Sequence, residues 1–262
     1  MKKATGEKPL VKGMQYHIHC KKGDLSRYIL IPGDPWRVPK IAANWTNAKK
    51  IAFYREYQTY TGYKDNVPIS ICSSGIGGSS LAIAIEELLA VGVDTFIRVG
   101  TTGAIQPNIQ LGDFIISAGA VRLDGASKDY IMPEFPAIAD YNVVLALIKA
   151  AQKLKVRYHV GITASTDTFY GGQSRKGHNG YIFSEKENLI TILQKANVLN
   201  FEMEAATLFT LASIFKARAG AICVVVANRV KNEFKITEEM EKKCGEIATE
   251  AIKILFNDDK RI

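Results

Sequence analysis

The stretch Thr95-Phe-Ile-Arg-Val-Gly-Thr-Thr-Gly103 decides how the rest of the chain is interpreted. Residues 95–99 are β-branched, aromatic or apolar except for Arg98, which predicts a strand in a covered sheet. The glycines and threonines that follow predict a tight turn at the end of this strand. An arginine there is costly to bury unless it meets an anion, and its planar guanidinium suits phosphate or carboxylate. Two interpretations stay open: an oxyanion site at Arg98, Gly100 and Thr101, or a buried arginine paired with an Asp or Glu.

The composition is that of a globular protein with one large α/β domain or two small ones. The chain has 262 residues, of which 47% are hydrophobic and 23% are charged, and its net charge is +8. The basic residues occur in short pairs, which gives no support for a nucleic-acid partner and suits a small anionic substrate. We expect no membrane span, because no window is long and apolar enough to cross a bilayer, and no signal segment. The four cysteines show no metal-type spacing, so we expect packed, reduced thiols in a cytoplasmic protein.

Two units of strand, glycine loop and helix precede the quoted stretch. In the first, a strand at Arg27–Pro32 passes through Gly33 into a helix that Pro35 opens. In the second, a strand at Pro68–Ser73 passes through a serine and glycine loop at residues 74–80. Glycines let a ligand approach bare backbone, and a helix N-terminus favours an anion. The second loop lacks the lysine of a P-loop and the spacing of a dinucleotide site, so we predict neither a nucleoside triphosphate nor an NAD site.

Strands and helices alternate along most of the chain. This alternation predicts a three-layer α/β/α single domain with a mixed, largely parallel central sheet. The domain is expected to span residues 14–262, after a flexible arm at residues 1–13 that is polar and rich in lysine. Glu86 and Glu87, on the helix after the serine and glycine loop, are expected to face solvent.

Further polar residues follow strands nearer the C-terminus. One loop contains Phe169, Gln173 and Arg175 close to a pair of glycines. Glu202 and Glu204 flank a methionine at the start of a predicted helix, where they suit either the helix dipole or a hydroxyl-binding site. Because ligands collect at the carboxyl ends of strands in α/β sheets, these residues are candidates for a substrate site.

Six motifs occur in the order found in a known family: Ile31-Pro-Gly-Asp-Pro35, Ser74-Gly-Ile-Gly-Gly78 with Glu86-Glu-Leu88, Arg98-Val-Gly-Thr-Thr-Gly103, Phe169-Tyr-Gly-Gly-Gln-Ser-Arg175, Phe201-Glu-Met-Glu204 and Val226-Ala-Asn-Arg229. Each motif is short, but the ordered set, from about residue 14 to the end, resembles the nucleoside phosphorylases of the uridine phosphorylase family. The resemblance implies the nucleoside phosphorylase fold and the phosphorolysis of uridine to uracil and ribose 1-phosphate. Ser79 departs from the usual Pro or Ala, and Gly171-Gly172 replaces a common Pro-Gly, which would loosen the base-binding loop.

The resemblance also implies a role for individual residues. Phosphate would be held by Gly33, Arg37, Arg98, Thr101 and, from a neighbouring subunit, Arg55. The ribose would be held by Met203, Glu204 and the neighbour's His17. The base would be held by Phe169, Gln173 and Arg175, with Arg229 acting indirectly or through water. The catalytic set would be Arg98, Gln173, Arg175 and Glu204. A monovalent cation, K⁺, between subunits would match Glu56, Ile76 and Ser80.

The implied enzyme uses inorganic phosphate as co-substrate and no organic cofactor, and it forms a hexamer as a trimer of dimers with shared active sites. Purine-cleaving relatives place an acid after the last strand, whereas Ala227-Asn228-Arg229 has no carboxylate there, which favours a pyrimidine. The alternative is a purine or broad-specificity nucleoside phosphorylase of the same fold. A hydrolytic nucleosidase would not need three phosphate arginines, and a silent nucleoside-binding protein would not need the whole set.

Overall fold

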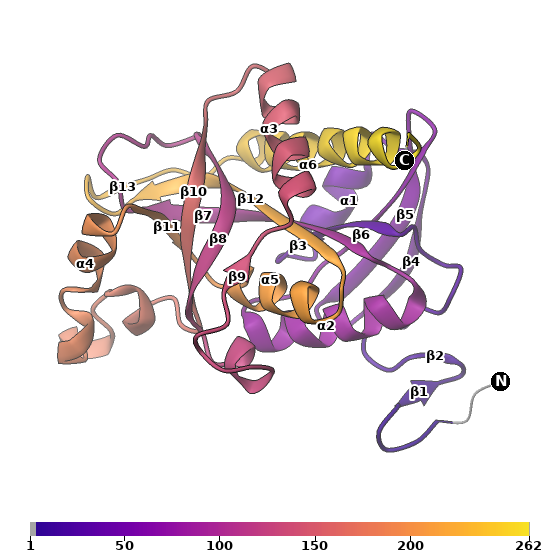
Figure 1. Ribbon diagram of the computed structural model, residues 1–262, viewed down its shortest axis with the longest axis horizontal. Coiled ribbons are helices and arrows are strands. Elements are labelled where there is room, and N and C mark those ends of the chain that lie inside the picture. Colours follow the sequence, from indigo (N-terminus) through magenta and orange to yellow (C-terminus); the bar gives the residue numbers. More distant parts are fainter. Residues whose placement is uncertain (1–3, 262) are drawn as a thin grey trace.

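The computed structural model describes residues 4–261, which fold around one large mixed sheet (Figure 1). The strands of this sheet are β3 (Tyr28–Pro32), β4 (Thr46–Tyr54), β5 (Tyr57–Lys64), β6 (Val67–Cys72), β7 (Thr95–Ala104), β8 (Phe114–Leu123), β9 (Ala137–Ile138), β10 (Tyr158–Thr166), β11 (Val198–Glu202), β12 (Arg218–Asn228) and β13 (Glu233–Phe234). A separate antiparallel hairpin consists of β1 (Leu10–Val11) and β2 (Met14–Gln15).

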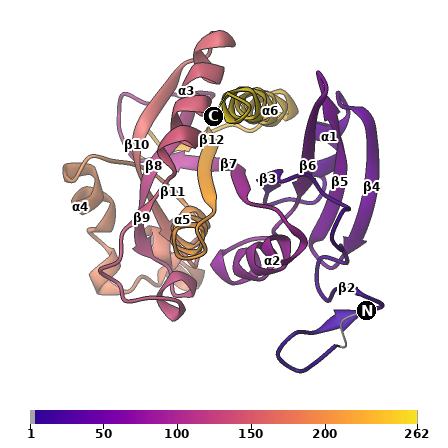
Figure 2. The same cartoon turned by 45° about the vertical axis from the view of Figure 1, so that its right-hand side comes forward.

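Helices cover both faces of the sheet and give the three layers that the alternating pattern predicts (Figure 2). The helices are α1 (Arg37–Ala42), α2 (Gly78–Val91), α3 (Tyr141–Lys153), α4 (Leu189–Lys195), α5 (Ala205–Ile214) and α6 (Glu238–Asp259). The buried residues of α1, α3 and α6 share one apolar cluster with the sheet, and those of α2 and α5 share a second cluster on the opposite face. Helix α4 packs in a smaller cluster with β11. The predicted single α/β/α domain is therefore confirmed.

Three of the strands that surround the later site, β3, β7 and β12, are parallel to one another. β7 lies between β3 and β12, and β3 also pairs with β6, all in parallel. Antiparallel pairs occur at β4–β5, β5–β6, β11–β7 and β12–β8. β12 also pairs with β8, β8 pairs with β10, and β10 pairs with β11, which in turn pairs with β7. The strand pairings therefore begin and end at β7, and this half of the sheet is closed. The sequence pattern gave no sign of this closure, because pairing between distant strands leaves no local trace.

The quoted stretch differs from its prediction in one respect. β7 does not stop at a turn after Val99, but continues through the glycines to Ala104 while paired with β12. Gly100 is needed for packing, since a Cβ there would lie 2.7 Å from the sulfur of Cys223 and 3.1 Å from a guanidinium nitrogen of Arg98. The glycine therefore makes room for the arginine side chain to fold back over its own strand.

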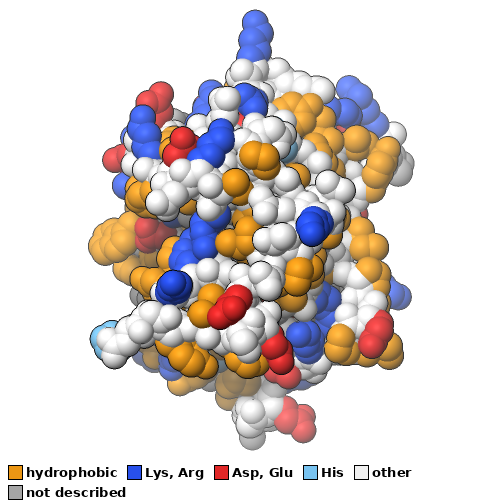
Figure 3. All heavy atoms as spheres, turned by 90° about the vertical axis from the view of Figure 1, so that its left-hand side faces the viewer, with side chains coloured by type: hydrophobic (Ala, Val, Ile, Leu, Met, Phe, Trp, Pro, Cys, Tyr) orange, Lys and Arg blue, Asp and Glu red, His pale blue; other side chains and the backbone are white. Residues whose placement is uncertain are grey.

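Residues outside the sheet fit the remaining expectations to different degrees. Residues 1–3 of the predicted arm lie outside the described residues, and the boundary between arm and domain at residue 14 stays a prediction. All four cysteines are buried free thiols, as packed thiols should be. Within residues 4–261, no helix combines the length and the apolar character that a bilayer span requires. Figure 3 shows one face of the molecule, on which basic, acidic and apolar side chains are intermixed.

Candidate active site

A single cavity of about 660 Å³ opens at the ends of β3, β7, β11 and β12. Most of the residues that the sequence nominated line it. These are Gly33, Arg37, Glu56, Ile76, Ser80, Arg98, Thr101, Phe169, Gln173, Arg175, Met203 and Glu204. Segments more than a hundred residues apart in sequence therefore contribute to one site, as ligand binding at strand ends predicts. Four nominated residues, His17, Arg55, Gly100 and Arg229, are not part of its wall.

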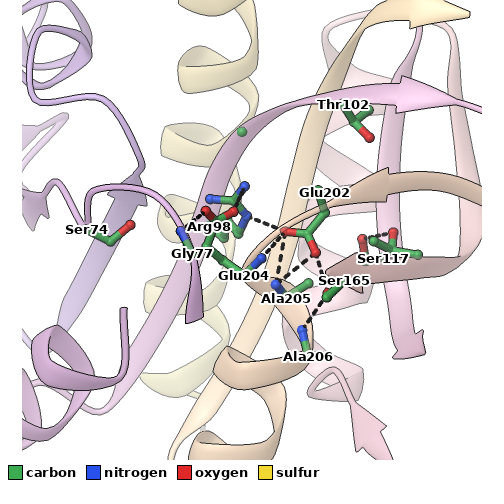
Figure 4. A network of polar contacts seen from close by, with 12 residues as sticks. Ser74, Gly77, Arg98, Thr102, Ser117, Ser165, Glu202, Glu204, Ala205 and Ala206 are labelled. Atoms are coloured by element: carbon green, nitrogen blue, oxygen red, sulfur yellow. Dashed lines mark hydrogen bonds and ion pairs between the residues drawn. The ribbon is translucent and has the colours of Figure 1, made fainter. Parts of the chain in front are cut away.

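Arg98 is buried between two carboxylates (Figure 4). Its Nε donates to Glu202 at 2.8 Å, and its Nη2 is ion-paired with Glu204. The two carboxylates raise the pKa of Arg98 further above its ordinary value, against the effect of burial. The paired arginine left open by the sequence is thus what the structure shows. Arg98 also lines the cavity, so pairing with acids and a place at a ligand site are compatible.

Glu202 supports this arrangement. The family resemblance assigned it no role, although its place beside Glu204 made it a candidate. Its carboxylate accepts hydrogen bonds from the backbone N–H groups of Glu204 at 2.9 Å and Ala205 at 3.0 Å, at the start of α5. The hydroxyl of Ser165 donates to the same carboxylate and accepts from the N–H of Ala206 at 2.9 Å. Of the two roles that the sequence allowed for this pair of acids, Glu202 serves the helix N-terminus.

Glu204 lines the cavity, as Glu202 does, but its carboxylate has different partners. One of its oxygens accepts the backbone N–H of Gly77 at 2.6 Å, which ties the strand-end acid to the start of α2. Burial and the neighbouring charge of Glu202 together raise the pKa of Glu204, and they outweigh Arg98 and the N–H of Gly77, which lower it. A hydrogen bond from a ligand hydroxyl would therefore stabilise the ionised form of this carboxylate.

The second basic residue of the cavity is also held by an acid. Arg37, at the start of α1, donates from Nε and places Nη2 on the same oxygen of Glu241, at 2.7 Å in each case. Both side chains are about 15% exposed, with 15% for Arg37 and 16% for Glu241. Glu241 is one of three acids in the first turn of α6, where acids suit the helix dipole, so its sequence position alone gave no sign of this contact.

The two glycine loops meet at the floor of the site. The carbonyl of Gly33 accepts the N–H of Gly75 at 2.9 Å, and a Cβ at Gly33 would lie 3.2 Å from the carbonyl oxygen of Gly75. Gly75 has a φ of +71°, a region that favours glycine. The close approach of bare backbone that the loops predict is therefore present, and both glycines line the cavity.

The opposite end of the cavity carries an amide and a guanidinium. Arg175 Nη1 donates to Gln173 Oε1 at 2.5 Å and to the carbonyl of Phe169 at 2.6 Å, and its guanidinium lies 3.8 Å above the Phe169 ring. Burial and the nearby charge of Arg229 lower the pKa of Arg175 to about 10. Arg229 donates to the carbonyl of Gln173 at 3.0 Å, so it supports this loop from behind.

The residues matched to a cation lie together at one edge of the cavity. The hydroxyl of Ser80 donates to Glu56 Oε1 at 2.8 Å, and a Cβ at Gly75 would meet both side chains. A carboxylate beside a hydroxyl offers the oxygen donors that a hard cation prefers. The side chain of Ile76 carries no oxygen, so only its backbone carbonyl can contribute one.

His17 and Arg55 lie on another part of the chain. His17 Nδ1 contacts Glu87 at 2.7 Å, whereas Arg55 is fully exposed in the turn between β4 and β5. Tyr16 lies between them, with its ring centroid 4.7 Å from that of His17 and its hydroxyl 3.5 Å from Arg55. The two residues that the sequence assigned to a neighbouring subunit therefore share one surface, away from the chain's own cavity.

Comparison with known proteins agrees with this geometry. The sequence model of the Phosphorylase superfamily matches residues 27–257, and the chain belongs to this superfamily. The uridine phosphorylase of Thermococcus kodakarensis is 60% identical over 98% of this chain and 92% of its own. The uridine phosphorylase of Klebsiella aerogenes is 42% identical over 94% of this chain and 97% of its own. A guanosine phosphorylase of Halorubrum lacusprofundi is 38% identical over 93% of this chain and 97% of its own.

Proposed function

We propose that the protein catalyses the reversible phosphorolysis of uridine to uracil and ribose 1-phosphate, a reaction of pyrimidine salvage. The observation that carries the proposal is the single cavity in which two arginines, a buried glutamate and a Gln/Arg pair meet. The relatives named uridine phosphorylase, at 60% and 42% identity, support the choice of uridine.

Phosphate would occupy the end of the cavity formed by Gly33, Arg37, Arg98 and Thr101. Cleavage of the N-glycosidic bond places positive charge on the ribose and negative charge on the leaving uracil. Phosphate supplies the nucleophile, so no protein carboxylate has to attack the sugar. The arginines hold this anion beneath the ribose, which turns an encounter in solution into a reaction between oriented partners. Because both arginines are already held by acids, their guanidinium groups need little reordering when phosphate enters.

The ribose would lie over Met203 and Glu204. A carboxylate whose pKa is raised by burial is short of hydrogen-bond donors, and a ribose hydroxyl supplies one. The same contact becomes stronger as the sugar ring becomes cationic, so it lowers the barrier as well as binding the substrate. His17 of a neighbouring copy would reach the 5′-hydroxyl, and Arg55 of that copy would reach the phosphate.

The uracil would face Gln173 and Arg175, with Phe169 beside it. An amide next to a guanidinium matches the adjacent donor and acceptor groups of a pyrimidine edge. Arg175 would also meet the negative charge that develops on the uracil oxygens, an effect worth about 3–4 kcal/mol for one well-placed donor. Arg229 supports this pair through the Gln173 carbonyl.

A purine is disfavoured by the side chain at the end of the last long strand, β12. Asn228 is buried, and its amide donates to the carbonyl of Ile109 at 2.8 Å. Its oxygen accepts the N–H groups of Val230 at 3.0 Å and Lys231 at 2.9 Å. An amide committed in this way cannot protonate a purine. The relative named guanosine phosphorylase, at 38% identity, keeps a purine or broad-specificity enzyme as the second candidate.

The test is to follow uridine, inosine and guanosine by absorbance, each at equal concentration, with and without phosphate. We expect the absorbance of uridine to change only when phosphate is present, and much faster than that of either purine nucleoside. Comparable rates for uridine and a purine nucleoside would favour the broad-specificity enzyme. An absorbance change without phosphate would show a hydrolase. No absorbance change for any substrate would favour a protein that binds nucleosides without cleaving them.

The proposal includes an assembly and a cation. We propose a hexamer, built as a trimer of dimers, because His17 and Arg55 lie outside the cavity of their own chain and a second copy would bring them to one. K⁺ would be held at the dimer interface by Glu56, Ile76 and Ser80, and no organic cofactor is proposed. Four buried free thiols suit a reducing cytoplasm. Light scattering in sodium and in potassium salts tests the assembly and its dependence on the cation.

A further inference from the structure

Glu87 is buried, although the sequence predicted that it would face solvent. It lies on α2 with only 8% of its surface exposed, whereas the preceding Glu86 is exposed. A buried carboxylate is expensive unless donors surround it. The groups that donate to Glu87 all belong to one short segment of the N-terminal region.

Residues 17 and 18 supply every hydrogen bond that Glu87 accepts among the described residues. The N–H of His17 lies 3.1 and 3.0 Å from the two carboxylate oxygens, and the N–H of Ile18 lies 2.9 Å from one of them. The ring nitrogen Nδ1 of His17 contacts the carboxylate at 2.7 Å. The backbone and the ring of His17 are thus fixed by one acid on a helix that packs in the core.

The contact also determines how the imidazole can be used. A carboxylate accepts hydrogen bonds, so Nδ1 carries a proton when it meets ionised Glu87. Nε2 is then the nitrogen that remains for an outside group, and the His17 side chain is 23% exposed. Tyr16 packs edge-on against the same ring with centroids 4.7 Å apart, which limits its rotation.

The His17 ring held in this way does not line the cavity of its own chain. Helix α2 begins beside that cavity, where Gly77 binds Glu204 and Ser80 forms part of the wall. Glu87 follows nine residues after Gly78, which corresponds to roughly 14 Å along the helix. One helix thus has its first turn in its own chain's site and holds, near its other end, a side chain that does not line that site.

We propose that Glu87 is a positioning residue for the active site of a neighbouring copy, where it orients His17 toward the 5′-hydroxyl of the nucleoside. This inference rests on the proposed function, which assigns that hydroxyl to His17. Glu87 touches no substrate itself. Its removal should therefore weaken only the recognition of the 5′-hydroxyl, and a substrate without that group should not respond.

The experiment compares uridine with 5′-deoxyuridine as substrates for the full-length protein. Glu87→Ala removes the carboxylate, and Glu87→Asp keeps the charge but withdraws it from the ring, which provides a second variant should alanine fail to fold. For both variants we expect kcat/KM to fall about tenfold on uridine, the effect of one good hydrogen bond, and less than about twofold on 5′-deoxyuridine. Glu86→Ala, one position away on the exposed face, should change neither value.

His17→Ala should reproduce this selective loss, and the double variant with Glu87→Ala should lose no more than His17→Ala alone, because the two residues act in series. An equal loss on both substrates, or an additive loss in the double variant, would overturn the positioning role and leave Glu87 as a structural anchor. If the wild type cleaves uridine with phosphate while Glu87→Ala and Glu87→Asp behave like it, only this inference fails. If the wild type does not cleave uridine, the proposed function fails and this inference with it.

Discussion

Glu202→Ala should mainly lower stability, whereas Glu204→Gln should mainly lower activity, although only Met203 separates the two acids. The reason lies in their partners. Glu202 is enclosed by Arg98, Ser165 and the start of α5, and it is 4% exposed. Glu204 is equally buried and lines the same cavity, but its carboxylate has different partners, and its pKa is raised because the site disfavours its charge.

The size of each effect follows from these contacts. Removing Glu202 breaks a buried ion pair with Arg98, which costs about 3–5 kcal/mol, and also leaves two backbone N–H groups of α5 without their acceptor. This is a large part of the roughly 5–15 kcal/mol that stabilises a typical domain. Glutamine at position 204 keeps an oxygen for Gly77 and for a neutral hydrogen bond to Arg98, whose charge Glu202 still balances, and it loses a charge that the site disfavours. Weakening the ion pair with Arg98 in this way should cost about 1–2 kcal/mol, less than the removal of Glu202.

The assay is urea denaturation of both variants, followed by steady-state kinetics on uridine at saturating phosphate. Glu202→Ala should lower the unfolding midpoint by roughly 1 to 2 M, for an m-value near 3 kcal/mol/M. Glu204→Gln should unfold closer to the wild type while kcat/KM falls about 10- to 100-fold, the loss of a charged hydrogen bond to ribose. If Glu202→Ala unfolds with the wild type, or Glu204→Gln is the less stable of the two, the division of roles is wrong.

Three further predictions follow from the same structure. The folded-state pKa of Glu204 is raised above 4.5, and the ionised form is the one that binds ribose. We therefore expect kcat/KM for uridine to rise with pH through that raised pKa. In the pH profile of Glu204→Gln, this rise at acid pH should be absent. Glu241→Ala should raise the KM for phosphate roughly tenfold and leave that for uridine nearly unchanged, because it frees Arg37; equal changes in both would exclude the role. A Cβ at Gly171 meets no atom within 4 Å, so Gly171→Ala should stabilise the protein by about 0.4–1 kcal/mol. A Cβ at Gly172 meets a threonine hydroxyl at 2.7 Å, so Gly172→Ala should destabilise the protein by about 1–3 kcal/mol. Thermal unfolding that ranks the two variants the other way would contradict the loop geometry.

The residues predicted from local motifs are those whose chemistry is written in their immediate neighbours. A strand that ends in an arginine, a glycine loop before a helix, and a Gln/Arg pair two residues apart each predicted a place on the cavity wall, and Arg98, Gly33 and Gln173 lie there. The layered α/β arrangement followed in the same way from the alternation of strand and helix patterns.

The residues that sequence reasoning missed are Glu241 and Glu87, and their partners lie far along the chain. Arg37 meets Glu241 across 204 positions, and His17 meets Glu87 across 70. An acid near a helix start or on a helix face has an ordinary local explanation, so nothing in its neighbours distinguishes a solvent-exposed side chain from a buried partner. Closure of the sheet from β7 around to β11 is missed for the same reason.

The central claim is that inorganic phosphate, held by arginines under the sugar, is the group that cleaves the nucleoside. The direct measurement is the initial rate of uracil release from uridine as a function of phosphate concentration, with ribose 1-phosphate quantified by ³¹P NMR. The account predicts a rate that saturates with phosphate, starts from zero in its absence and yields one ribose 1-phosphate for each uracil. Uracil released at an unchanged rate without phosphate, with free ribose as the other product, would contradict it.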